Sequence, residues 1–141
     1  MGKVLTKLID EATMAAATAT GTYRRISEHQ GKLKKLRDEL VKFRKQNSKK
    51  IDKMFEDEIR EFSDGFAKLN RQYYKDYDNF GQQVDKIRIA VGNLHGHVLE
   101  REKKNRWGKR ESTKEARELV KTLNATYNDL WKKVKEVKHI G

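Results

Sequence analysis

The feature that most constrains this chain is a run of apolar side chains, three or four residues apart, from Ile26 to Val98. This spacing keeps one apolar stripe on one side of an α-helix. The sequence also contains no proline. β-Sandwiches and doubly wound α/β folds need frequent turn signals and usually some proline. The spacing therefore predicts an all-α protein, an elongated helical bundle or coiled coil.

The stripe is too long for one compact domain. It covers 73 residues, which as one helix would measure about 110 Å. A compact chain of 141 residues has a radius of gyration of only about 14 Å. Either the stripe folds back on itself, or a partner covers an elongated rod. Turn residues that could allow a fold-back occur at four places: Asn47-Ser48, Ser63-Asp64-Gly65, Asn79-Phe80-Gly81 and Gly92 to Gly96.

Ser63-Asp64-Gly65 is the best turn signal among these places. The apolar spacing nevertheless continues through it, from Phe62 to Phe66, and one glycine costs a helix only about 1 kcal/mol. The stripe next takes Tyr73 and Tyr77, and this repeated step of four predicts a local relaxation of the supercoil. A kinked long helix and a helical hairpin both remain open.

We expect a single all-helical domain over residues 1–141. A first helix, rich in Ala and Thr, occupies 1–21 and ends at Gly21, a residue typical of helix C-caps. The long helix or hairpin follows over 22–100, and a basic loop over 101–112. Ser112 and Glu115 have the spacing of a capping box, so the last helix is predicted over 113–141.

Composition excludes several other classes. The chain has no cysteine, which excludes disulfide scaffolds and thiolate metal sites. It has no apolar run of 18 residues, so no transmembrane helix is expected. Lys7, Asp10 and Glu11 interrupt any secretory signal at the N-terminus. We therefore expect a location in the cytoplasm or within a virus particle.

Charge is distributed in blocks along a chain whose net charge is +12. Residues 32–53 carry a net of +7, residues 54–64 a net of −4, and residues 101–110 a net of +5. Alternating blocks indicate pairing between folded-back segments or between neighbouring copies. Basic side chains also neutralise phosphates, and an exposed indole stacks on bases. Solvated faces are the alternative. The candidate nucleic-acid-binding residues are Arg101, Lys103, Lys104, Arg106, Trp107, Lys109, Arg110, Lys34, Lys35, Arg37, Arg44 and Lys45.

Candidate protein-interface residues are Tyr73, Tyr77, Phe80, Gly92 and Gly96. Aromatic clusters line partner grooves, although they more often pack in a core. Glycines four residues apart allow close helix–helix approach. His95 and His97 could share a metal only in a strand or loop, because residues two apart on a helix point away from each other. We expect no metal and no cofactor.

No catalytic constellation is present in the sequence. It has no HExxH motif, no phosphate-binding glycine loop and no cysteine nucleophile, and the acidic run from Glu56 to Glu61 is predicted to form ion pairs. We expect a non-enzymatic structural or assembly protein that self-associates or packs into a larger complex. A phage or virus particle component would fit. The alternatives are a basic accessory protein that binds DNA or RNA, and a helical inhibitor or adaptor.

Overall fold

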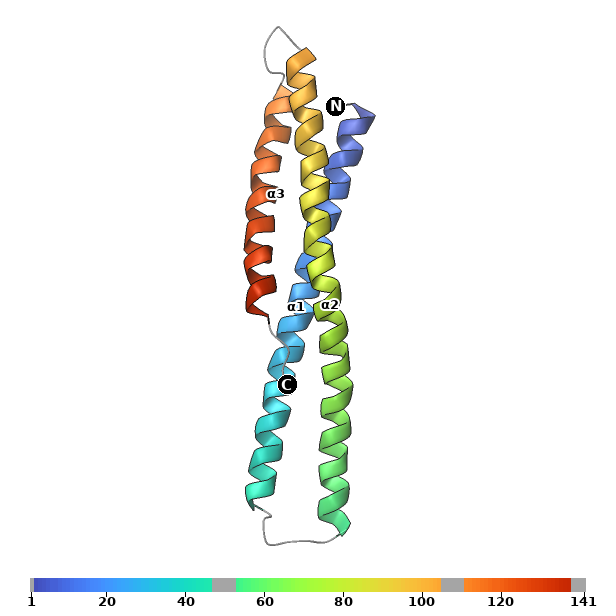
Figure 1. Ribbon diagram of the computed structural model, residues 1–141, viewed down its shortest axis with the longest axis vertical. Helices are drawn as coiled ribbons and strands as arrows, with labels where there is room; N and C mark the ends of the chain where they lie inside the picture. The colour runs from blue at the N-terminus through green and yellow to red at the C-terminus, as the bar shows by residue number, and fades with distance from the viewer. Residues whose placement is uncertain (1, 47–52, 105–110, 138–141) are drawn as a thin grey trace. The chain divides into compact units, whose positions relative to one another are not determined.

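The described part of the chain forms three α-helices. A computed structural model describes residues 2–46, 53–104 and 111–137. The helices are α1 (Lys3–Gln46), α2 (Lys53–Lys104) and α3 (Glu111–Glu136), as Figure 1 shows. No strand occurs within those ranges. The predicted all-α helical bundle is confirmed.

The helix boundaries differ from those predicted. Gly21 does not end the first helix, which continues to Gln46, and α2 runs unbroken through Gly65 and Gly81. The apolar stripe continues past each of these glycines, and its burial outweighs a helix penalty of about 1 kcal/mol per glycine. The 22–100 segment is therefore divided between two helices. Asn47-Ser48, the first of the suggested fold-back places, follows α1 directly and lies outside the described residues.

The expected loop over 101–112 was also too long. The helix α2 continues to Lys104, and α3 begins at Glu111 rather than after Ser112. Residues 101–104 lack apolar periodicity, but Glu102 and Arg117 form an ion pair that joins this last turn to α3. This contact between helices supports the last turn of α2, which the apolar spacing does not predict.

The chain divides into two compact units that share α1 and α2. The first unit comprises Met1–Thr22 and Asn79–Val137, so it contains the start of α1, the second half of α2, and α3. Figure 1 shows that the second half of α2 and α3 are antiparallel, and the ion pair between Glu102 and Arg117 joins them. The buried apolar core of the first unit is Leu5, Ala12, Ala16, Ala19, Phe80, Val84, Ile87, Val91, Leu94, Val98, Ala116, Val120, Leu123, Leu130 and Val137.

The second unit comprises Tyr23–Asp78 and Lys138–Gly141. Its described part is an antiparallel pair of helix segments from α1 and α2, which we call the hairpin. The rings of Phe43 and Phe62 lie 5.8 Å apart near one end, and His29 faces Asp76 near the other. Ile26, Leu33 and Tyr73 are fully buried between the segments.

One register assignment in the stripe was wrong. After Tyr73 the next buried position is Asp76, followed by Phe80 and Val84, whereas Tyr77 is only half-buried. The steps from Tyr73 are therefore three, four and four, so the repeated step of four falls at Asp76, Phe80 and Val84 rather than at Tyr73 and Tyr77. Tyr77 was assigned to the stripe because it is the more apolar residue, but the buried side chain at this level of the hairpin is that of Asp76.

Candidate functional site

The hairpin buries its apolar stripe incompletely. Leu33 and Tyr73 have no exposed surface. Further along each helix, large apolar side chains of the same stripe remain half-buried. In a two-helix hairpin each helix covers only one side of the other, and no third helix of the second unit occurs in the ranges that the structure describes. The half-buried side chains are Leu36, Leu40, Phe43, Ile59, Phe62, Phe66 and Leu69.

These side chains form the floor of a groove along one side of the hairpin. A hollow of about 550 Å³ is lined by Leu36, Phe43, Phe62 and Gly65, with Glu58 and Glu61 at its edge. A second hollow of about 270 Å³ shares Leu36 with the first. It is also lined by Lys32, Lys35, Glu39 and Leu69. We call these adjoining hollows the hairpin groove.

Gly65 leaves an opening in the α2 side of the groove. A Cβ atom built at Gly65 would meet no heavy atom within 4 Å. Because glycine has no side chain, the space beside the α2 backbone at this position is open. An approaching helix could therefore bring a side chain close to the α2 backbone at this point.

The two helices of the hairpin carry opposite charge. Residues 32–46 of α1 contain seven Lys and Arg against two acids, a net of +5. Residues 56–64 of α2 contain five acids against one Arg, a net of −4. The predicted alternation of charge blocks therefore becomes, in space, a basic helix beside an acidic one. Among the described residues no ion pair joins these two segments, and Lys32 pairs with Glu28 of its own helix.

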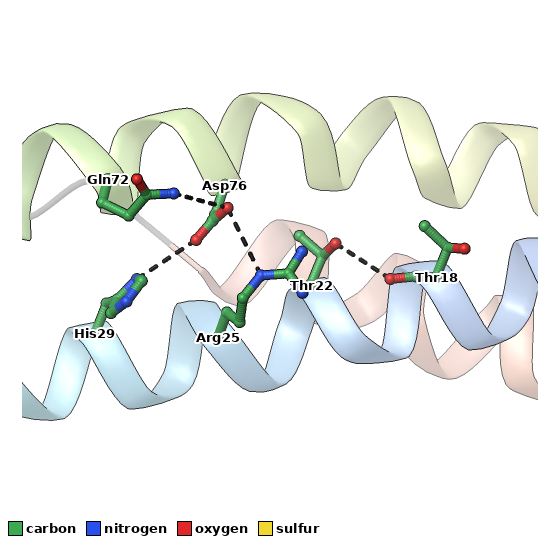
Figure 2. Close-up of polar contacts among 6 residues, drawn as sticks. All are labelled: Thr18, Thr22, Arg25, His29, Gln72 and Asp76. Atoms are coloured by element: carbon green, nitrogen blue, oxygen red, sulfur yellow. Dashed lines mark hydrogen bonds and ion pairs between the residues drawn. The ribbon is translucent and has the colours of Figure 1, made fainter.

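Asp76 is a buried carboxylate that sequence analysis missed. Its side chain is 7% exposed and lies in the hairpin seam. Figure 2 shows its three partners: Arg25 Nε is 3.9 Å from Oδ1, His29 Nδ1 is 3.4 Å from Oδ2, and Gln72 donates from Nε2 to Oδ1 over 3.4 Å. All three distances exceed those of strong charge-assisted hydrogen bonds. The available signal was that the three–four spacing between Tyr73 and Phe80 fits position 76 as well as position 77.

Thr22 is a second buried polar residue of the described chain, and it lies in the first unit. Its hydroxyl donates to the carbonyl oxygen of Thr18 over 3.1 Å, one helical turn earlier (Figure 2). This bond satisfies the buried hydroxyl donor of Thr22 within α1.

The aromatic candidates lie mainly in the interior. Tyr73 is fully buried in the hairpin, and Phe80 is 1% exposed in the first unit. Burial raises the pKa of the Tyr73 phenol above its ordinary value of 10.0, and the neighbouring Tyr77 and Tyr74 raise it further. Tyr77 is half-buried. This placement is the core packing that such clusters usually serve.

Gly92 and Gly96 lie on an exposed face of α2 in the first unit. A Cβ atom at either position would meet no heavy atom within 4 Å. No helix of the described chain uses them for close approach, and their role as contacts for another protein stays a prediction.

The basic candidates fall into two described groups. Lys34, Lys35, Arg37, Arg44 and Lys45 are all exposed along α1. At the end of α2, Lys103 and Lys104 are exposed and Arg101 is half-buried. The remaining candidates, Arg106, Trp107, Lys109 and Arg110, lie outside the described residues.

The described ranges contain no group of three or more His, Asp or Glu side chains placed to hold a metal ion. His95 and His97 are both within α2, where neighbours two apart diverge. None of the helix segments in the described chain is both long and apolar enough to cross a membrane. Comparisons with protein-family models, with curated proteins and with solved structures find no match.

Proposed function

We propose that this protein is a non-enzymatic assembly protein that packs through its helical seams into a larger complex. The hairpin groove carries the proposal, because its apolar floor is half-buried along several helical turns. Covering apolar surface contributes about 2.5 kcal/mol per 100 Å². A partner that completes the hairpin would gain this free energy. The virus-particle setting expected from the sequence stays a prediction.

A second candidate function is nucleic-acid binding through α1. The exposed Lys34, Lys35, Arg37, Arg44 and Lys45 form no ion pair with any residue that the structure describes. Such a face can displace counterions from phosphates, and the affinity then falls steeply with salt. Lys and Arg side chains spread along one helix contact phosphates rather than base edges, so binding would be independent of nucleotide sequence.

Light scattering on a size-exclusion column separates these functions. The protein is run at several concentrations, with and without a short DNA duplex, at low and high salt. Assembly predicts a mass well above 16.6 kDa that rises with concentration and is indifferent to the duplex. A monomer that co-elutes with the duplex at low salt and releases it at high salt would favour nucleic-acid binding. A monomer that does neither would favour the inhibitor or adaptor alternative.

A further inference from the structure

We infer that the hairpin groove binds the same groove of a second copy of this chain, forming a four-helix bundle with the hairpin ends aligned. The inference rests on the proposed assembly function and names its first partner. Each hairpin supplies two antiparallel helices with one open apolar side. Four-helix bundles are the usual way for such a surface to be covered on all sides.

Charge selects the second copy and its orientation. A two-fold axis parallel to the hairpin places the basic α1 segment of each copy opposite the acidic α2 segment of the other. Every helix then has only neighbours of opposite net charge, +5 beside −4. A two-fold axis perpendicular to the helices would place α1 on α1 and α2 on α2, and like charges would repel. The surface is thus self-complementary, as a two-fold interface requires.

The size of the surface agrees with a stable dimer. Residues 23–46 of α1 span about 36 Å, and two helices side by side are about 20 Å wide. The hairpin side therefore has a projected area of about 700 Å². A standard interface buries about 800 Å² on each partner. The whole hairpin side, with the groove at its centre, is therefore close in size to one partner's share of a standard interface.

Gly65 provides a substitution that tests the interface without damaging the hairpin. In Gly65→Lys the new Cβ has open space, and replacement of a mid-helix glycine favours the helix. The lysine would occupy the groove and face the partner's basic helix. Gly31→Lys is the matched control, because Gly31 is exposed within α1 and also has open space around its Cβ.

The first experiment measures mass against concentration by sedimentation equilibrium for the wild type and both variants. We expect a wild-type dimer of twice 16.6 kDa, an unchanged dimer for Gly31→Lys, and a dissociation constant raised at least about tenfold for Gly65→Lys, which corresponds to 1.4 kcal/mol. If the wild type and Gly65→Lys dimerise equally well, the groove interface is overturned but the assembly function stands. A wild type that stays monomeric at every concentration overturns both.

A charge exchange tests the orientation. One variant carries Glu58→Lys with Glu61→Lys, and the other carries Lys42→Glu with Lys45→Glu, which lie at the same level because Phe43 contacts Phe62. The first variant lowers the net charge of residues 56–64 from −4 to 0, and the second lowers that of residues 32–46 from +5 to +1. Each variant alone should therefore dimerise more weakly than the wild type. An equal mixture restores one contact of +5 with −4 and should form a heterodimer. Circular dichroism checks that each is helical, and a variant that unfolds leaves the decision to Gly65→Lys. Folded variants that each dimerise as well as the wild type would overturn the orientation.

Discussion

Replacing the mid-helix glycines of α2 with alanine tests whether this helix is continuous. Gly65 and Gly81 both lie well inside Lys53–Lys104. A Cβ at either position would meet no heavy atom within 4 Å, so a methyl group neither clashes nor gains a contact. The remaining effect is the lower backbone entropy of alanine in the unfolded chain, which favours the helix by about 1 kcal/mol.

We expect Gly65→Ala and Gly81→Ala each to raise the unfolding temperature by about 4 °C for a chain of this size. The two sites are about 24 Å apart along the helix, so the double variant should gain about 2 kcal/mol. Thermal unfolding followed by circular dichroism measures both gains. Gly31→Ala in α1 should behave alike and serves as the control.

A lower unfolding temperature at either position would refute this reasoning. Such a loss would mean that the glycine has a backbone conformation that alanine cannot adopt, as in a turn. Gly81 lies in the first unit and outside the hairpin groove. Its gain is therefore independent of any association through that groove.

Three further predictions concern single side chains. Burial raises the folded-state pKa of Tyr73 above 10.0. The neutral phenol therefore contributes fully to the free energy of unfolding below about pH 10, and this contribution is lost as the pH rises through the folded-state pKa. Tyr73→Phe should flatten this alkaline fall in stability, measured by urea unfolding. Arg117→Ala leaves Glu102, 14% exposed, without its partner, and should cost about 1–2 kcal/mol after screening of the half-exposed arginine; an unchanged midpoint would contradict this. Asp76→Asn should change the unfolding free energy by less than about 1 kcal/mol, because the attraction of Asp76 to its distant partners Arg25 and His29 only roughly offsets the cost of burying its charge. A loss above about 3 kcal/mol would show that the carboxylate is a net stabiliser.

The sequence predicted the fold class because the three–four apolar spacing depends only on local helix geometry. Ile26, Leu33, Val84 and Leu94 were all assigned to the stripe, and all are fully buried. Helix ends were predicted less well. Gly21 is a typical C-cap residue, yet the helix continues past it because buried residues on both sides keep the same phase.

The candidate site was only partly predictable. Charge blocks are visible in the sequence, but their placement on adjacent helices depends on where the chain reverses. The groove could not be found from spacing, because Phe62 and Leu33 belong to the same stripe, yet Leu33 has no exposed surface and Phe62 is half-buried. Asp76 was missed because both it and Tyr77 fit the spacing between Tyr73 and Phe80, and the more apolar Tyr77 was chosen.

The most direct test of the aligned dimer is a distance between two spin labels. The chain has no cysteine, so Arg24→Cys creates a single labelling site on an exposed position of the hairpin. With hairpin ends aligned, the two labels lie at the same level, and electron–electron double resonance should report about 20–30 Å, set by the width of the bundle. With ends opposed, Arg24 of one copy would lie level with residue 45 of the other, and the labels would be offset by about 32 Å along the helices. A dominant distance at or beyond that value would contradict the aligned arrangement.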